Sequence, residues 1–263
     1  MDLNLSGRHA LVCGASQGIG RATAIELAEL GADVTLLARS AEQLTMLAES
    51  LPRKHASQKH TWHSVDMLDT NALKAAAFDI VEANPVHILI NNTGGPPGGP
   101  IHSAETVAFE DTFRQHVLAA HTLLQSVLPG MHDSAYGRVV NVISTSVKEP
   151  IPGLGVSNTV RAAMAAWAKT MAIELAADGI TVNNVLPGYT RTARLDGILT
   201  MQAQKTGRNE QELAKEMAAA VPARRFGEPG EVAAVIAFLC TPAAAYVNGV
   251  SIAVDGGRTK ALS

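Results

Sequence analysis

Gly14-Ala15-Ser16-Gln17-Gly18-Ile19-Gly20 is the stretch that decides the fold of this chain. It follows the apolar run His9–Cys13 directly, and the amphipathic segment Gly20–Leu30 begins where it ends. This order is typical of a strand, a tight turn and a helix, in which glycines let backbone N–H groups approach a pyrophosphate and the helix N-terminus favours an anion. An ordinary strand-to-helix turn is the alternative. In this setting the stretch predicts a dinucleotide site contacted by Gly14, Ser16, Gln17, Gly18, Ile19 and Gly20.

Short apolar runs alternate with helical segments along the rest of the chain, which is the pattern of βαβ units and a parallel sheet. The runs are His9–Cys13, Val34–Ala38, Thr61–Val65, Val86–Ile90, Arg138–Ile143, Thr181–Leu186 and Val250–Val254. Two long helices are expected, one over 104–128 from its apolar spacing and one, rich in alanine, over about 157–177. Their apolar surface is broader than one sheet face needs, which indicates a subunit interface. We predict a single doubly wound α/β (Rossmann) domain over 1–263.

The composition excludes several classes of protein. Of the 263 residues, 47% are hydrophobic and 17% are charged, which suits a compact globule, and a net charge of −3 gives no reason to expect nucleic acid or an anionic membrane as a partner. No apolar run approaches the length of a membrane span, and the N-terminus lacks the regions of an export signal. Cys13 and Cys240 lie in apolar segments and are expected to be small buried side chains. We expect a cytoplasmic protein without a metal site.

The end of the second apolar run indicates which dinucleotide is bound. A carboxylate is expected about 20 residues past the glycines when the ribose has a free 2′-hydroxyl, but this chain has Ala38 there and Arg39 beside it. A guanidinium can pair with a 2′-phosphate, so Arg39 favours NADP over NAD, and a solvated surface charge is the alternative. Asp66, at the end of the third run, is placed either to accept a hydrogen bond from the adenine amine or to cap a helix.

Together with the glycine turn, several further motifs make the chain resemble the short-chain dehydrogenase/reductase family, especially its 3-oxoacyl-carrier-protein reductase-like members. The resemblance covers nearly the whole length. These motifs are Asn91-Asn92-Thr93-Gly94, Asn141-Val142-Ile143-Ser144, Pro187-Gly188-Tyr189-Thr190-Arg191-Thr192, Arg225-Phe226-Gly227-Glu228-Pro229 and Val254-Asp255-Gly256-Gly257.

The resemblance implies a fold and a cofactor site. It implies a mostly parallel sheet of seven strands and commonly a homotetramer packed through the two long helices. Asn91 would steady the central strand, while Asn92 and Gly94 would lie at the cofactor, Gly94 against its ribose. Pro187, Gly188 and Thr192 would fix the carboxamide.

The catalytic set that the resemblance implies is altered in this chain. The family uses asparagine, serine, tyrosine and lysine, and motif spacing maps these roles onto His116, Ser144, Ser157 and Arg161. Only the serine survives. A phenol titrates near 10 and can be tuned towards working pH, whereas a serine hydroxyl is a far poorer acid. Ser157 could still hold a relay water or a substrate oxygen, and Arg161 could keep the ribose contacts and a fixed positive charge.

Other side chains could supply the proton. Tyr189 follows the Pro187-Gly188 turn and has suitable chemistry, although a tyrosine there is often only a pocket wall. His116 has a pKa suited to neutral catalysis, or serves as a hydrogen-bonded structural residue. His55, His60 and His63 are expected to be solvated in a loop ahead of a strand, because their spacing matches no metal pattern.

Two functions of different classes follow. The first is an NADP-dependent oxidoreductase acting on a small-molecule or acyl-thioester carbonyl or on an alcohol, with a rearranged proton path through Ser144 and water, His116 or Tyr189. The second is a dinucleotide-binding protein that has lost catalysis and serves as a sensor or assembly subunit. Ser144 and the Thr192 turn favour the enzyme, because a silent protein need not keep them. The irregular, polar region 190–223 is expected to form a flap over the site.

Overall fold

A twisted sheet of seven strands forms the centre of the molecule. The computed structural model describes residues 1–262 and gives the strand order β3-β2-β1-β4-β5-β6-β7, in which every pair is parallel. The strands are β1 His9–Cys13, β2 Asp33–Ala38, β3 His60–Ser64, β4 Ile88–Asn91, β5 Gly137–Val142, β6 Ile180–Pro187 and β7 Ser251–Val254. The predicted doubly wound α/β domain is thus confirmed, and the sheet is entirely parallel. The order reverses between β1 and β4, which is where ligands bind in such sheets.

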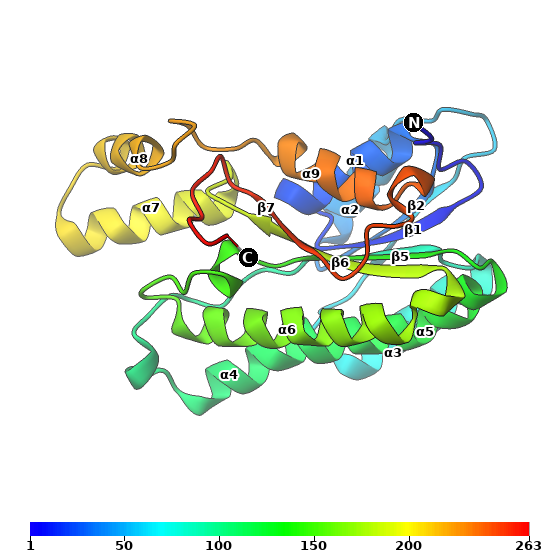
Figure 1. Cartoon of the computed structure of the whole chain (residues 1–263), viewed down its shortest axis with the longest axis horizontal. Coiled ribbons are helices and arrows are strands. Elements are labelled where there is room, and N and C mark those ends of the chain that lie inside the picture. Colours follow the sequence, from blue (N-terminus) through cyan, green and yellow to red (C-terminus); the bar gives the residue numbers. More distant parts are fainter. Residues whose placement is uncertain (263) are drawn as a thin grey trace.

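Helices cover both faces of the sheet, as a parallel sheet requires. Figure 1 shows α1, α2 and α9 on one face and α3, α4, α5 and α6 on the other. Their bounds are α1 Gly18–Glu29, α2 Ala41–Ser50, α3 Thr70–Ala83, α4 Thr106–Phe113, α5 Ala119–Asp133, α6 Gly155–Glu174 and α9 Pro229–Leu239.

Alternate residues of the central strands supply the two cores. Val12 and Ile90 pack with the face that holds α1, α2 and α9, whereas Leu11 and Leu89 pack with the face that holds α3, α5 and α6. Because both faces are covered, the strands read as continuous apolar runs rather than alternating ones. This explains why the runs could be recognised in the sequence.

The helix expected over 104–128 is longer than predicted and is not uniform. It begins at Thr106, ends at Asp133 and changes to π-helical hydrogen bonding over Arg114–Leu118, between α4 and α5. A π segment adds a residue to one turn and shifts the side chains that follow, and such segments are frequent at functional sites. His116 lies in this segment and is buried.

The expectation that His60 and His63 are solvated in a loop is wrong. Both lie in β3, where His60 pairs with Val34 and His63 with Leu37. His60 is half-buried, its Nε2 lies 3.1 Å from the carbonyl oxygen of Pro52, and burial lowers its pKa. Pairing with β2 thus begins one residue earlier than the apolar pattern indicated.

Beyond the sheet, α7 (Ala193–Thr206) and α8 (Glu210–Ala219) project from one end of the molecule (Figure 1). They have a small apolar core of their own, built from Leu195, Leu199, Leu213 and Phe226. Across residues 1–262, no helix is both long and apolar enough to cross a membrane. Cys13 and Cys240 are buried free thiols, as expected, and burial raises the pKa of each to about 12.

Candidate functional site

A cleft of about 600 Å³ runs along the carboxyl ends of β1, β2, β3, β4, β5 and β6. Most of the predicted site residues line it. They are Gly14, Ser16, Gln17, Gly18, Ile19, Arg39, Asp66, Asn92, Gly94, Ser144, Ser157, Arg161, Pro187, Gly188, Tyr189 and Thr192. Gly20 and His116 do not line it.

The glycine turn is built for close approach. Gly14 and Gly18 have φ of +58° and +57°, a conformation that favours glycine. A Cβ on Gly20 would lie 2.2 Å from the carbonyl oxygen of Gly14, so a side chain cannot be accommodated there. Asn92, which follows the neighbouring strand β4, holds the turn in place, because its Nδ2 donates to the carbonyl oxygens of Cys13 and Gly14 at 3.3 Å.

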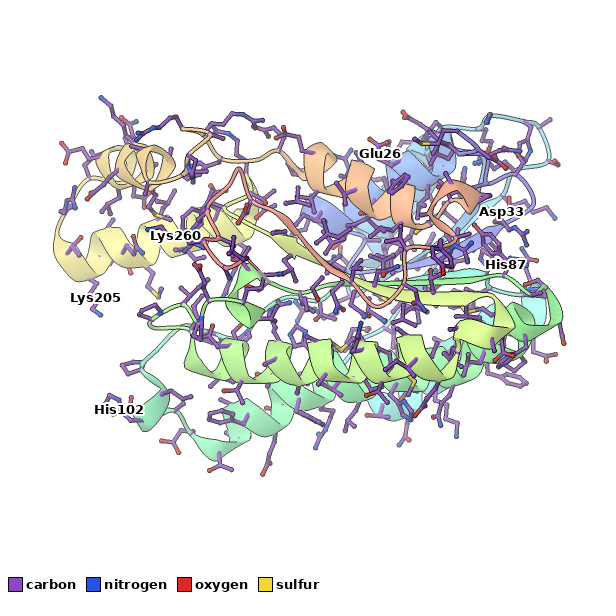
Figure 2. The ribbon with its side chains drawn as sticks, in the orientation of Figure 1. Glu26, Asp33, His87, His102, Lys205 and Lys260 are labelled. Atoms are coloured by element: carbon purple, nitrogen blue, oxygen red, sulfur yellow. The ribbon has the colours of Figure 1, made fainter. Side chains whose placement is uncertain are left out.

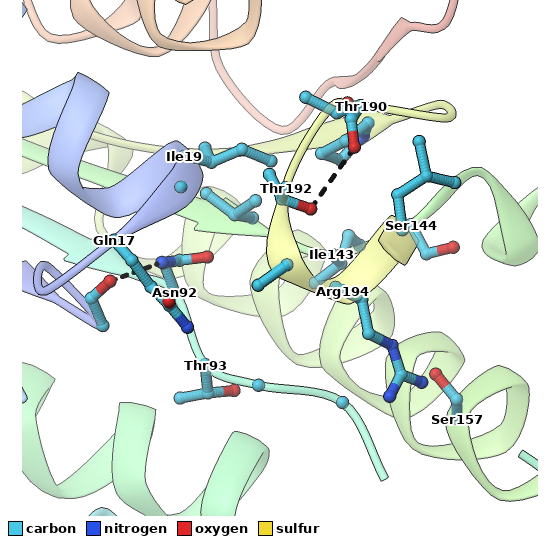
Figure 3. Close-up of a pocket in the computed structure, with 18 of the residues that line it drawn as sticks. Gln17, Ile19, Asn92, Thr93, Ile143, Ser144, Ser157, Thr190, Thr192 and Arg194 are labelled. Atoms are coloured by element: carbon cyan, nitrogen blue, oxygen red, sulfur yellow. Dashed lines mark hydrogen bonds between the residues drawn. The ribbon is translucent and has the colours of Figure 1, made fainter. Parts of the chain in front are cut away.

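The N-terminus of α1 fits a diphosphate. Its N-cap residue, Gln17, makes no side-chain capping bond in the described structure, and the first turn holds no acidic residue. The N–H groups of that turn therefore face the cleft with partial positive charge and without a protein carboxylate to compete for them. Figure 3 shows Gln17, the N-cap residue of α1, beside Asn92.

At the far end of the cleft, Arg39 and Asp66 are brought together with Ala38 and Ser40. Arg39 is exposed and has no carboxylate within ion-pair distance among residues 1–262, so its charge is available to a ligand. Asp66 lies two residues beyond β3, and its Oδ1 accepts from the backbone N–H of Leu68 at 3.0 Å. Asp69, and not Asp66, caps α3.

The loop after β6 forms the wall opposite α1. A Cβ on Gly188 would lie 2.6 Å from Cβ of Asp255, so this glycine is required where the Pro187–Thr192 motif packs against the Val254–Gly257 motif. Thr192 Oγ1 donates to the carbonyl oxygen of Thr190 at 3.3 Å (Figure 3). A Cβ on Gly18 would lie 3.2 Å from Cγ2 of Thr192, which places the loop directly against the glycine turn.

A row of asparagines supports this end of the sheet. Asn91 donates to Asn141 at 2.9 Å, Asn141 donates to Asn184 at 3.0 Å, and Asn184 donates to Ser251 at 3.1 Å. These residues are register partners on β4, β5, β6 and β7. This chain of buried side-chain hydrogen bonds links four strands in one register beneath the cleft.

Ser144 presents a free hydroxyl proton to the cleft. Its Oγ accepts from the backbone N–H of Ser146 at 3.1 Å, which fixes the oxygen and leaves the O–H to donate. Ser157 is buried on the first turn of α6, and its Oγ accepts from Nε of Arg161 at 3.3 Å. Both serines can therefore donate a hydrogen bond to a ligand oxygen.

Arg161 is a buried cation without a carboxylate partner in residues 1–262. Its Nη1 donates to the carbonyl oxygens of Val142 and Ile143, at 3.1 and 2.9 Å. Burial first, and the charge of Arg194 second, lower its pKa to about 10. Arg161 thus stays charged at neutral pH and cannot act as an acid there.

His116 is held as a neutral structural residue. Its Nε2 donates to the carbonyl oxygen of Gly94 at 3.1 Å, so Nδ1 must accept from Oγ1 of Thr93, 2.7 Å away. Burial first, and the charge of Arg161 second, lower its pKa to about 3. An imidazole that holds no second proton at neutral pH argues against His116 as the proton donor. Its hydrogen bonds instead fix Thr93 and Gly94 in the cleft wall.

Tyr189 lies in the cleft wall with its hydroxyl next to a cation. Arg258 stacks on its ring, with Cζ 4.4 Å from the ring centre, and donates from Nη2 to its Oη at 3.3 Å. The phenolic proton of Tyr189 is therefore left free to donate.

Two cleft residues, Arg194 and Arg258, were not identified from the sequence. Nothing local distinguishes Arg194 from Arg191 and Arg208, which lie in the same polar region and form surface ion pairs. Arg258 directly follows the Val254–Gly257 motif, but nothing in the sequence indicates that the C-terminal segment reaches the cleft. No group of three or more metal-ligating side chains occurs in the part of the chain that the structure describes.

Comparison with known proteins identifies the family. The family model described as enoyl-(acyl carrier protein) reductase matches residues 14–259. The chain belongs to the short-chain dehydrogenase/reductase family. Among the similar members is the NADPH-dependent reductase BacG of Bacillus subtilis, 30% identical over 263 residues, or 98% of this chain and all of BacG. Another is the 3-oxoacyl-[acyl-carrier-protein] reductase FabG of Vibrio cholerae, 33% identical over 97% of this chain and 98% of FabG.

Solved structures of the short-chain dehydrogenase/reductase family agree with this fold. The L-sorbose reductase of Gluconobacter frateurii, complexed with NADPH and L-sorbose, has a TM-score of 0.93 at 29% identity and covers both chains completely. The predicted resemblance to this family, including its 3-oxoacyl-carrier-protein reductases, is confirmed.

Proposed function

We propose that this protein is an NADP-dependent oxidoreductase that transfers hydride between the nicotinamide and a carbonyl or alcohol substrate. The observation that carries the proposal is one cleft that joins the glycine turn to the free hydroxyl of Ser144. Its relatives described as NADPH-dependent, and the solved structure with NADPH bound, support the same cofactor. NAD is the alternative that the unpaired Arg39 disfavours.

The residues that would hold the cofactor are spread along the cleft, from its Arg39 end to its substrate end. Arg39 would pair with the 2′-phosphate, Asp66 would accept from the adenine amine through its free Oδ2, and the first turn of α1 would hold the diphosphate. Gly94, Arg161 and the Pro187–Thr192 loop would hold the ribose and the carboxamide. When bound, the cofactor supplies or accepts the hydride.

The proton path would run through groups other than a tyrosine at position 157. Ser144 would donate a hydrogen bond to the reacting oxygen, and the fixed charge of Arg161 beside Ser157 would stabilise negative charge that develops there. Water bound by Ser157, or the free hydroxyl of Tyr189, would then deliver the proton. His116 would contribute only through the hydrogen bonds that fix Thr93 and Gly94 in the cleft wall.

The altered catalytic set also favours a second candidate, a silent dinucleotide-binding sensor or assembly subunit. In that case Ser157→Tyr combined with Arg161→Lys would create activity that the parent lacks. Strong turnover by the parent would exclude this candidate.

The direct test combines binding with turnover. Calorimetry with NADPH establishes the cofactor, and NADPH consumption is then followed with neutral ketones, oxo acids and 3-oxoacyl thioesters. Turnover of any member supports the oxidoreductase. Tight NADPH binding without turnover across the whole panel would contradict it, and no binding of NADPH or NADH would contradict both candidates.

The proposal also includes a flap over the cleft and a homotetrameric assembly. The segment 190–223, which holds α7 and α8, would act as a flap over the substrate end of the cleft. A homotetramer would form through α4 and α6, where Phe109, Phe113, Leu118 and Val160 line an apolar groove of about 470 Å³. Light scattering of the wild type and of Phe113→Asp, which places a charge in the groove, tests the assembly. An unchanged mass would contradict this interface.

A further inference from the structure

We propose that the substrate carries an anionic group, a carboxylate or a phosphate, bound between Arg194 and Arg258 at the substrate end of the cleft. This inference rests on the proposed oxidoreductase function and narrows its substrate class. Arg161, Arg194 and Arg258 line that end, whereas the one carboxylate among the described lining residues, Asp66, lies at the other end beside Arg39.

Arg194 differs from the other arginines around it. Arg191 pairs with Glu228 at 2.9 Å and Arg208 pairs with Glu216 at 2.8 Å, both on the outer surface. Within residues 1–262, Arg194 has no carboxylate within 4.0 Å, and its Nη2 donates a hydrogen bond to the carbonyl oxygen of Pro96 at 2.8 Å. Figure 3 shows its side chain extending from the start of α7 into the cleft towards Ser157.

Arg161 and Arg194 bring two like charges close together. Their Nη2 atoms lie 3.6 and 3.5 Å, respectively, from the point that a Cβ on Gly95 would occupy. Arg161 is nine-tenths buried, and the charge of Arg194 is one cause of its lowered pKa. Two guanidinium groups without a counter-ion repel each other, and a bound anion would relieve that repulsion.

Arg258 supplies the third charge and is held rigidly. Its Nη1 donates to Oγ1 of Thr145 at 3.4 Å, and it stacks on Tyr189. Asp255 accepts from the backbone N–H of Thr259 at 2.7 Å. Glu149 accepts from the backbone N–H of Lys260, which Figure 2 labels, at 2.7 Å. These two bonds hold the C-terminal segment in place. The guanidinium is thus held in the cleft beside Tyr189 and Thr145, the residue that follows Ser144.

The arrangement matches an anion and not a neutral acyl chain. Guanidinium groups bind carboxylate and phosphate through paired, charge-assisted hydrogen bonds. The cofactor phosphates would be bound elsewhere, by Arg39 and the N-terminus of α1. A substrate whose carbonyl lies near its own carboxylate or phosphate would place the reacting oxygen at Ser144 and its charge between the arginines.

The test compares matched pairs of compounds that differ in one charge. The pairs are 2-oxobutanoate with its methyl ester, acetoacetate with its methyl ester, and dihydroxyacetone phosphate with dihydroxyacetone, and acetoacetyl-pantetheine serves as a neutral thioester. For each, kcat/KM is measured with NADPH, and the affinity for the enzyme loaded with NADP⁺ is measured by calorimetry, where no turnover occurs. We expect at least one charged member to exceed its neutral partner by about 10- to 150-fold, which is the range for a hydrogen bond to a charged group.

Two substitutions and a control test whether Arg194 and Arg258 cause the preference for charged substrates. Arg194→Gln and Arg258→Gln should each reduce the ratio of charged to neutral substrate by at least about tenfold, and Arg194→Lys should restore part of it. Lys205→Gln removes the same charge from the exposed far end of α7 and should leave the ratio unchanged (Figure 2). The carboxylate and phosphate pairs distinguish the two sources of the anion.

The outcomes separate this inference from the proposed function. Equal or greater use of the neutral partners would overturn the anion site and leave the oxidoreductase standing. A preference for anions that survives both glutamine substitutions, or no binding of any anion to the NADP⁺-loaded enzyme, would also overturn it. Anion binding that needs Arg194 without any turnover would support the site and count against the oxidoreductase.

Discussion

Burial fixes the charge of His116, and this has a consequence for stability. In the unfolded chain the imidazole titrates near 6.5, whereas in the folded protein its pKa is about 3. Between these values the unfolded state binds more protons, so the free energy of unfolding falls as pH falls below 6.5. His116→Gln removes this dependence. We expect the wild type to lose about 2 kcal/mol more than the variant between pH 7 and pH 5, measured by urea denaturation.

The same substitution separates His116 from the other histidines. Burial is the first cause that lowers the pKa of His9, His60 and His87, and those residues act equally in the wild type and the variant. The difference between the two proteins therefore reports His116 alone. Parallel pH profiles would show that its pKa is not depressed.

The catalytic role of Ser144 can be tested by removing its hydroxyl group. Ser144→Ala removes a donor that faces the reacting oxygen, and we expect kcat to fall by about 100-fold while the affinity for NADPH stays unchanged. Ser146→Ala is the matched control, because its Oγ is buried and has no hydrogen-bond partner among the described residues. Steady-state kinetics and calorimetry measure both. A Ser144→Ala enzyme with wild-type kcat would remove Ser144 from the mechanism.

At the scale of an element, the turn that opens α1 depends on steric closeness. A Cβ on Gly20 meets the Gly14 carbonyl oxygen, which is fixed by the strand and by Asn92. We expect Gly20→Ala to lower the free energy of unfolding by about 1–3 kcal/mol and to weaken NADPH binding by at least tenfold, because the turn must open. Chemical denaturation and calorimetry test this.

Gly230 provides the control for that substitution. It lies in the first turn of α9, and a Cβ there meets no atom within 4 Å. Gly230→Ala should stabilise the protein slightly, by up to about 1 kcal/mol, because alanine favours the helix. Equal effects of the two substitutions would show that helix propensity, and not the close approach in the turn, governs Gly20.

Local signals account for what the sequence predicted, and tertiary contacts account for what it did not. The glycine turn and the strand ends were recognisable because their chemistry lies in adjacent residues. The π segment was not predicted, because a change in backbone hydrogen bonding over Arg114–Leu118 has no signature in the residue types. The roles of Arg194 and Arg258 depend on which arginines lack a carboxylate, and only the folded chain decides that.

At the scale of the whole molecule, the cleft collects residues at the ends of six strands and from the C-terminal segment, so cofactor binding should stabilise the entire fold. A ligand that binds only the native state at 100 times its Kd adds about 2.7 kcal/mol. For a chain of this length, NADPH should therefore raise Tm by about 5–10 °C in a thermal scan. NADH should raise it less, because it leaves Arg39 unpaired. In Arg39→Ala the two cofactors should give similar shifts, whereas a variant that still prefers NADPH would assign the 2′-phosphate to another residue.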